Sequence, residues 1–171
     1  MFPLKFKSED LSVEKLSKGI DLSPFCCDFE DELGVNEFIH TEACMFQENN
    51  FGITYLFYYK DFLVGIVTLA MGNIDANKQA PDKEEIDEEI TINQYPSLLI
   101  GRLGVHNDCR KKGLGKIICD WSAALATKLQ KKIGCRYISA TTVQKLIPFY
   151  EKCDFKTTNP RRKYPIMVRK V

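Results

Sequence analysis

The chain has 171 residues, of which 44% are hydrophobic and 27% are charged, and its formal net charge is +1. This length and composition predict a single globular domain, residues 1–171, with a substantial core. No run approaches the roughly 18 apolar residues of a membrane-spanning helix, and the opening seven residues lack the apolar core of a signal peptide. We therefore expect a cytoplasmic protein with no membrane partner.

The seven cysteines are odd in number and scattered, and none forms a C-x-x-C pair. In a reducing compartment such residues are more often small buried hydrophobes than disulfides, metal ligands or nucleophiles. With only two histidines, His40 and His106, a metal site would need carboxylates, and no spacing of acidic residues indicates one. The sequence therefore predicts no metal.

The first predicted elements are a short helix over 8–18 and a longer helix over 30–48. In the longer helix, apolar residues recur on one face, and His40 lies off that face and should be exposed. Two β-rich runs follow, at 53–59 and 62–70, with a spacing typical of a hairpin. Because their alternation is poor, one strand is expected to be buried on both faces. The apolar stripe of the longer helix comprises Val35, Phe38, Ile39, Ala43 and Phe46.

An acidic, polar stretch occupies residues 72–95. Its segment 82–89 contains six acids and one lysine, a net charge of −5, so the remaining residues carry +6. Long stretches of this kind inside a domain are uncommon without a function or disorder. We interpret residues 72–95 as either a surface excursion or a loop on the substrate side.

The run 97–105 is the central strand by its apolar content, although it contains Gly101 and Gly104. Glycine weakens a strand interior and often marks a bulge or the close approach of a ligand or another backbone. Arg102 lies among apolar neighbours, so it is either paired structurally or directed at a substrate.

Seven residues, 110–116, form the turn between this strand and an amphipathic helix predicted over 114–132. Gly113 and Gly115 leave backbone N–H groups free of side chains at a helix N-terminus, where unpaired donors and the helix dipole attract anions. The sequence indicates a phosphate cradle, and the alternative is an ordinary helix start with a solvated charge run.

The remaining elements are a strand over 136–141, a short helix over 143–152 that contains Pro148, and two strands over 155–158 and 164–169. The order of strands and helices predicts a mixed α/β sheet.

Two motifs resemble those of the GNAT superfamily of N-acetyltransferases. Arg110-Lys111-Lys112-Gly113-Leu114-Gly115 is similar to its Q/R-x-x-G-x-G/A acyl-CoA loop, which likewise follows a strand and opens a helix. Phe149-Tyr150-Glu151-Lys152-Cys153-Asp154-Phe155 resembles its F/L-Y-E-x-x-G-F segment. The resemblance implies an α/β (α+β) fold, with a central mixed, mostly antiparallel sheet flanked by helices and splayed at the central strand.

A narrower likeness involves residues 99–105, which resemble the L-L-G-R-L-A-V strand of the subgroup that includes toxins acetylating aminoacyl-tRNA. Two positions depart from the family pattern. Asp154 stands where the family usually has glycine, and Val143 stands where many members place an asparagine.

The resemblance implies acetyl-CoA as the cosubstrate and Tyr150 as the general acid that protonates the departing thiolate. The alternative for Tyr150 is a core aromatic of an amphipathic helix. No general base is indicated, since Glu89, His106 and Glu151 would act only through a water. The cofactor-binding residues are expected to be Leu103, Gly104 and Val105 for the pantetheine arm, and Arg110, Lys111, Lys112, Gly113, Leu114, Gly115 and Lys116 for the pyrophosphate.

The acceptor is an amine on a small molecule, a protein or an aminoacyl-tRNA. Three hypotheses follow: a small N-acetyltransferase acting on an unidentified primary amine, a toxin that acetylates aminoacyl-tRNA, and a non-catalytic module that binds acyl-CoA or a partner. The oligomeric state stays open, with a homodimer among the candidates.

Overall fold

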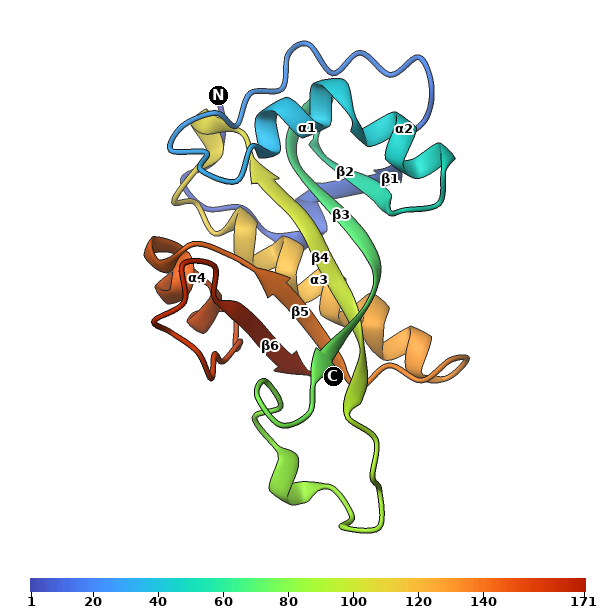
Figure 1. The fold of residues 1–171 in the computed structure, drawn as a ribbon. Coiled ribbons are helices and arrows are strands. Elements are labelled where there is room, and N and C mark those ends of the chain that lie inside the picture. The colour runs from blue at the N-terminus through green and yellow to red at the C-terminus, as the bar shows by residue number, and fades with distance from the viewer. The chain divides into compact units, whose positions relative to one another are not determined.

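Figure 1 shows the computed structural model, which describes residues 1–171 apart from the side chain of Lys83. Six strands form one sheet in the order β1-β2-β3-β4-β5-β6. The pairs β1–β2, β2–β3 and β5–β6 are antiparallel, and β4–β5 is parallel. The mixed sheet with flanking helices confirms the predicted fold class. The strands are β1 (Leu11–Lys15), β2 (Ile53–Tyr59), β3 (Phe62–Asp75), β4 (Gln94–Val105), β5 (Tyr137–Thr141) and β6 (Ile166–Lys170), and the helices are α1 (Val35–Thr41), α2 (Ala43–Glu48), α3 (Leu114–Gln130) and α4 (Ile147–Glu151).

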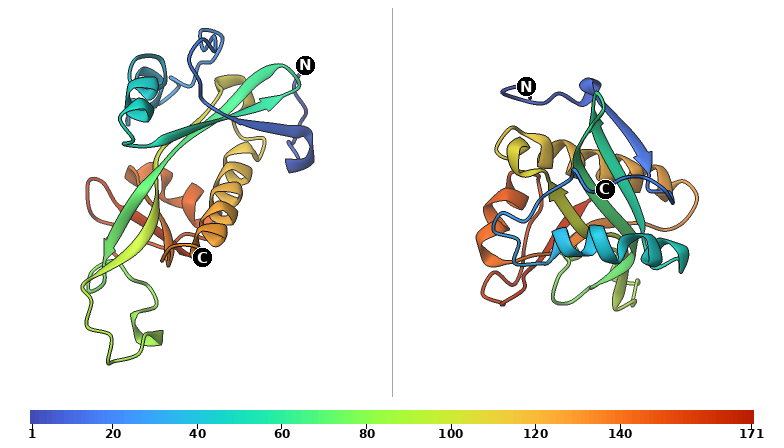
Figure 2. Two further views of the ribbon diagram at one scale, coloured as in Figure 1. Left: turned by 90° about the vertical axis from the view of Figure 1, so that its right-hand side faces the viewer. Right: turned by 90° about the horizontal axis from the view of Figure 1, so that it is seen from above.

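The chain divides into two compact units, which are described in turn. The first comprises Met1–Ala70 and Gly101–Asp120, and the second comprises Met71–Ile100 and Trp121–Val171. Strands β3 and β4, the long twisted strands of Figure 2, contribute residues to both units, as does helix α3. Whether the whole chain acts as one domain stays a prediction.

The core of the first unit lies between helices α1 and α2 and strands β2 and β3. Val35, Phe38, Ile39 and Ala43 pack there with Leu56 and Ile66 of the strands, which confirms the predicted apolar stripe. His40 is exposed, as expected.

The predicted helix over 30–48 begins only at Val35 and is interrupted at Glu42, so it forms two helices. The late start has a local cause. Gly34 has a positive φ of 66°, and the carboxylate of Asp31 accepts hydrogen bonds from the N–H groups of Val35 (2.9 Å) and Asn36 (2.7 Å), which caps α1.

The helix predicted over 8–18 is wrong, because Leu11–Lys15 form the edge strand β1 and Ser8–Asp10 form a 3₁₀ turn before it. Five residue pairs join β1 to β2 in antiparallel register. Pairing with a distant strand outweighs the weak local helical pattern. The predicted hairpin is confirmed as β2 and β3, and Lys60 supplies the positive φ of its turn. As expected, one strand is buried on both faces, since residues 64–69 of β3 are consecutively buried.

In the second unit, the parallel ladder between β4 and β5 runs from the Ser97–Tyr137 pair to the Ile100–Ala140 pair. Strand β6 then pairs antiparallel with β5 along five residues. The strand predicted over 155–158 is wrong, because only Lys156 forms a bridge, with Val168. Turn chemistry prevails in this segment: the hydroxyl of Thr157 accepts a hydrogen bond from the N–H of Asn159 (3.2 Å).

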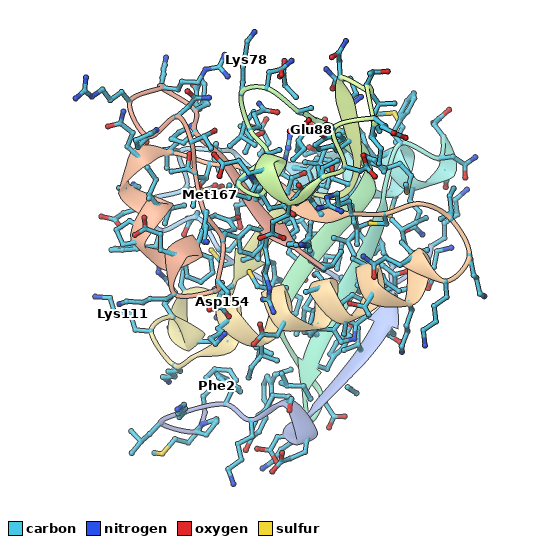
Figure 3. All side chains as sticks on the ribbon, turned by 90° about the horizontal axis from the view of Figure 1, so that it is seen from below. Phe2, Lys78, Glu88, Lys111, Asp154 and Met167 are labelled. Carbon is cyan, nitrogen blue, oxygen red and sulfur yellow. The ribbon has the colours of Figure 1, made fainter. Side chains whose placement is uncertain are left out.

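The acidic excursion spans residues 76–93, which is shorter than predicted because β3 continues to Asp75 and β4 begins at Gln94. Lys78 and Glu88, labelled in Figure 3, belong to it. The carbonyl of Lys78 accepts hydrogen bonds from the side chains of Thr158 and Asn159. Among the described residues, no helix combines the length and apolar character needed to cross a membrane.

Asp82 is the main anchor of the excursion, and its side chain is only 8% exposed. Its carboxylate accepts hydrogen bonds from the hydroxyl of Tyr137 and from Arg136 Nη2 (2.6 Å), and Lys170 Nζ lies at 3.1 Å. Burial alone would raise the pKa of Asp82. The hydrogen bonds from Tyr137 and Lys170, with the charge of Arg136, outweigh burial and hold this pKa below its usual 3.8.

We predict that Asp82→Asn lowers the free energy of unfolding at pH 7 by about 1–3 kcal/mol, because the buried cluster loses its charged acceptor. Since the pKa of Asp82 is lowered by folding, its contribution is complete above about pH 4 and is lost as the pH falls through the folded value. Urea unfolding across this pH range measures the effect. Glu88→Gln, an exposed substitution on the same excursion, is the control, and equal stability of both variants at pH 7 would contradict the prediction.

Candidate active site

The loop predicted to bind phosphate begins where β4 ends, and backbone hydrogen bonds fix its start. The N–H of His106 donates to Val64 O (2.9 Å), and the N–H of Asn107 donates to Cys26 O (2.8 Å). A 3₁₀ turn, Asn107–Cys109, follows, with the N–H of Cys109 bonded to His106 O (2.8 Å). The entry to the loop is therefore held from both β3 and the segment before α1.

Side chains reinforce this attachment. Asn107 Nδ2 donates to Asp28 Oδ1 (2.7 Å), and Asn107 Oδ1 accepts from the N–H of Phe29 (3.2 Å). Arg110 Nη1 donates to Phe29 O (2.8 Å), its guanidinium lies 4.9 Å from the centre of the Phe29 ring, and Glu30 lies 3.9 Å away. Sequence reasoning missed Asn107, and it assigned the charge of Arg110 to phosphate although this side chain holds the 28–30 turn.

Five consecutive backbone N–H groups of the loop are unpaired. Within the part of the chain that the structure describes, the N–H groups of residues 111–115 donate to no acceptor, and in the first turn of α3 the N–H of Ile117 donates to Gly113 O (3.3 Å). Unpaired N–H groups at the positive end of a 17-residue helix attract anions. The loop therefore fits the pyrophosphate of an acyl-CoA.

Backbone conformation explains the glycine at position 113. Gly113 has a φ of +83°, which side chains rarely adopt, and Lys111 has a φ of +59°. A Cβ atom on Gly113 would lie 3.8 Å from Lys5 Cγ, an ordinary contact. Glycine is thus needed at position 113 for its backbone conformation. The space that a side chain would occupy there contains the methylene groups of Lys5 and is not open on that side.

Close packing seats the first turns of α3 on the sheet. A Cβ atom on Gly65 of β3 would lie 2.7 Å from Ile118 Cδ1, so any larger residue there would force the end of the Ile118 side chain to move. Leu114 and Ile118 are both fully buried. The position of the N-terminus of α3 is therefore fixed by packing on β3 as well as by the loop that precedes the helix.

The three residues predicted to pair with pantetheine, Leu103, Gly104 and Val105, lie outside the β4–β5 ladder, which ends at Ile100. Gly104 is closely packed, since a Cβ atom there would lie 3.0 Å from Cys27 Sγ and 3.1 Å from side-chain atoms of Ile66 and Val35, so a side chain would fit only if these neighbours moved.

Arg102 has partners within its own unit. Its Nη1 donates to Gly101 O (2.8 Å), and its guanidinium lies 4.8 Å from the centre of the Phe38 ring. Of the two interpretations of Arg102, these contacts favour a structural role.

In the second unit, Tyr150 lies in α4 and is 6% exposed. Its ring makes edge-to-face contacts with Phe149 (5.0 Å) and Phe155 (5.3 Å). Pro148 is tolerated because it occupies the first turn of this short helix, where its missing N–H costs nothing. The aromatic contacts fix the orientation of the Tyr150 ring.

The departure at Asp154 leaves the turn after α4 intact. Asp154 adopts a φ of +65°, the left-handed conformation for which glycine is usual. The N–H groups of Asp154 and Phe155 donate to Glu151 O and Tyr150 O, both at 3.0 Å. Figure 3 labels Asp154 at this turn and Lys111 in the loop before α3.

The thiols of Cys27 and Cys109 are not suited to nucleophilic attack. Burial raises the pKa of Cys109 to about 11 and that of Cys27 to about 12, so both stay protonated near neutral pH. Cys44 is exposed, whereas Cys27, Cys109, Cys119, Cys135 and Cys153 are buried, as expected for most of them. A direct attack of an amine on a thioester needs no cysteine.

His106 also has a local role. Its Nδ1 accepts a hydrogen bond from the N–H of Asp108 (3.2 Å), and its Nε2 lies 3.3 Å from Pro24 O. Across the described residues, no group of three or more histidine, cysteine or acidic side chains is placed to hold a metal ion.

A mixed sheet with an unpaired N–H loop between β4 and α3 is the architecture of an acyl-CoA-dependent acyltransferase. The sequence profile of the acetyltransferase (GNAT) domain matches residues 53–157, and the chain belongs to this family of N-acetyltransferases. No match was found among the sequences of curated proteins.

Solved structures of similar fold include AtaT complexed with acetyl-methionyl-tRNAfMet, at 18% identity and a TM-score of 0.80, over 94% of this chain and 95% of that one. KacT with a tyrosine replaced by phenylalanine matches at 17% identity and a TM-score of 0.80, with the same coverage. A tyrosine-to-phenylalanine variant of the toxin AtaT, bound to the C-terminus of the antitoxin AtaR and acetyl-CoA, matches at 17% identity and a TM-score of 0.70, over 94% and 93%. At these identities the likeness supports the fold.

We predict that Gly113→Val weakens acetyl-CoA binding at least tenfold, because a β-branched residue is strained at a φ of +83° and the loop N–H groups shift. Titration calorimetry measures the dissociation constant. Gly19→Val is the matched control: its φ is +88°, nothing lies within 4 Å of its Cβ direction, and it is remote from the loop in sequence. Equal affinity of the two variants would exclude the loop as the cradle.

Proposed function

We propose that this protein is an acetyl-CoA-dependent N-acetyltransferase whose acceptor is the α-amino group of an aminoacyl-tRNA. The observation that carries the proposal is the row of five unpaired N–H groups in a member of the GNAT family. A basic turn attached to the segment that leads into the helix containing Tyr150 supports the choice of acceptor.

The donor would bind along β4 and the loop. Pyrophosphate oxygens would accept hydrogen bonds from the N–H groups of residues 111–115, with attraction from the charges of Lys111, Lys112 and Lys116. The pantetheine arm would pair with the backbone of Leu103, Gly104 and Val105. When bound, acetyl-CoA supplies an activated thioester carbonyl, and the chain has to orient it and provide a proton.

Tyr150 is the group we assign to that proton. As the amine nitrogen bonds to the carbonyl carbon and the C–S bond breaks, the Tyr150 hydroxyl protonates the leaving sulfur, the proton lost by the nitrogen passes to solvent water, and water reprotonates Tyr150. An α-amino group has a pKa of about 7.7–8.0 and is partly neutral near pH 7.5, so the acceptor needs no strong base from the chain. Such an acceptor is therefore compatible with a chain in which no residue is identified as the general base.

The acceptor surface would include the basic turn 161–163. Arg161, Arg162, Lys163 and the following Tyr164 are all exposed, and the Lys163 ammonium lies 5.3 Å from the centre of the Tyr164 ring. Gln144 Nε2, in the turn that leads into α4, donates to Arg162 O (3.1 Å). The turn is therefore attached to the segment that positions Tyr150, and it combines cations for phosphates with an aromatic ring for stacking.

The structural neighbours favour this acceptor over an unspecified amine. AtaT was captured with an acetylated aminoacyl-tRNA, and a variant of it was captured with an antitoxin and acetyl-CoA. By analogy, we propose a toxin role and a protein antitoxin as a partner of this chain.

We predict that Tyr150→Phe lowers kcat about 100-fold and changes the dissociation constant of acetyl-CoA less than twofold, because general acid catalysis typically contributes that much. The measurement is the rate of CoA release with methionyl-tRNA as acceptor. Tyr59→Phe, in β2, controls for removing a tyrosine hydroxyl elsewhere. Unchanged turnover in Tyr150→Phe would contradict the assignment.

Three further outcomes separate the competing functions. Growth arrest on induced expression, relieved by Tyr150→Phe, supports a toxin, whereas normal growth with CoA release on small-molecule or protein amines favours a different acceptor. Binding of acetyl-CoA without CoA release on any amine would support a non-catalytic module.

We predict that replacing Arg161, Arg162 and Lys163 together with alanine weakens tRNA binding at least tenfold and reduces the slope of log K against log salt by about 2, because each phosphate contact releases counterions. Filter binding at several salt concentrations measures both quantities. The control replaces Lys131 and Lys132, an exposed basic pair just after α3. An unchanged slope in the triple variant would exclude the basic turn from the acceptor surface.

A further inference from the structure

The N-terminal segment, residues 2–6, is attached to the phosphate loop, although it lies more than a hundred residues away in sequence. The N–H of Phe6 donates to Lys112 O at 3.0 Å, within the loop itself. The Phe6 ring is 2% exposed and makes an edge-to-face contact with Tyr59 at 5.5 Å. Phe6 is therefore a buried anchor and not part of a loose terminus.

Phe2 provides the second anchor. Its ring makes an edge-to-face contact with Phe62 at 5.8 Å, and its centre lies 6.4 Å from that of His106, which opens the turn before the loop. The ammonium of Lys112 lies 5.7 Å from the centre of the same ring. Figure 3 labels Phe2 in this segment. Lys5 is thus held between two aromatic anchors.

The stem of Lys5 lies against the centre of the loop. A Cβ atom on Gly113 would be 3.8 Å from Lys5 Cγ and 3.9 Å from Lys5 Cε, so the methylene groups of Lys5 cover this glycine. The side chain crosses the residue that separates the free N–H groups of Lys112 and Leu114.

The basic side chains around the loop differ in whether a carboxylate already pairs with them. Arg110 is paired with Glu30 at 3.9 Å, and Lys116 is paired with Asp120 at 3.2 Å. Lys5, in contrast, is exposed and forms no ion pair with any residue that the structure describes. Its charge is therefore available at the loop, whereas two of the cations predicted from the motif are partly neutralised.

We propose that residues 2–6 form a wall of the acyl-CoA site and that Lys5 binds a phosphate group of the bound acyl-CoA. This inference rests on the proposed donor site and adds to it a residue outside the family motif. The ammonium of Lys5 supplies charge to the pyrophosphate or to the 3′-phosphate, while the bond from Phe6 to Lys112 O keeps the loop in its binding conformation.

Titration calorimetry with CoA and with dephospho-CoA, which lacks the 3′-phosphate, tests the proposal. Lys5→Ala should weaken CoA binding about three- to tenfold, and Lys5→Glu should weaken it more, because a like charge then faces the phosphate. A loss with both ligands assigns Lys5 to the pyrophosphate. A loss with CoA alone assigns it to the 3′-phosphate.

Lys7→Ala is the matched control, since Lys7 is on the same segment, is exposed and pairs with Glu9 at 4.0 Å. It should bind CoA as the wild type does, and thermal melts should show that all three variants fold. Wild-type affinity of Lys5→Ala and Lys5→Glu for both ligands overturns this inference and leaves the donor site intact. Failure of the wild type to bind CoA would instead overturn the donor site itself.

Discussion

The backbone N–H groups of residues 111–115 have to stay unpaired while the loop that presents them keeps one conformation, and this constraint governs the first unit. Unpaired donors cannot stabilise their own loop, so the stabilising bonds come from its two ends and from the loop carbonyl of Lys112, which accepts the N–H of Phe6. His106 and Asn107 fix the entry through Val64 O and Cys26 O, and the contact of Gly65 with Ile118 fixes the exit. The loop itself uses only conformations that leave its donors free.

The same constraint explains why side chains around the loop bind other parts of the protein. Arg110 would be an obvious phosphate ligand in the motif, yet it holds the carbonyl and the ring of Phe29. A rigid cradle made from backbone donors needs such supports, because its affinity depends on preorganisation more than on the number of cations. Charge that remains available then has to come from exposed lysines, of which Lys5 and Lys111 carry no ion pair among the described residues.

The sequence was sufficient for the elements whose signals are local. The hairpin, the strand 97–105, helix α3 and the loop between them all follow from apolar periodicity and glycine spacing, and the structure contains them. Strand β1 was not predictable because its stabilising partner, β2, lies about 40 residues away. Lys5 and Phe6 were missed for the same reason, since their contacts with Gly113 and Lys112 leave no trace in the local pattern.

A glycine in a motif can have more than one cause, and the sequence does not distinguish between them. The sequence left a bulge and a close approach as alternatives for Gly104, and the structure shows a close approach of side-chain atoms of Cys27, Ile66 and Val35. At position 154 the reverse holds: aspartate replaces the usual glycine and still adopts the left-handed conformation. At position 154 the conformational requirement is met by another polar residue, whereas at Gly104 any side chain would have to displace its neighbours.

The near-neutral net charge and the acidic excursion both argue against an anionic acceptor when only the composition is considered. The structure changes the weight of this argument. Asp82 and Glu85 of the excursion form ion pairs with Arg136 and Lys170. Part of the negative charge of the excursion is therefore neutralised within the second unit. The cations of the basic turn 161–163 are exposed and have no carboxylate partner among the described residues. Since exposed charges separated by more than about 8–10 Å are largely screened, the local charge of the basic turn matters more to a polyanion than the total of the chain.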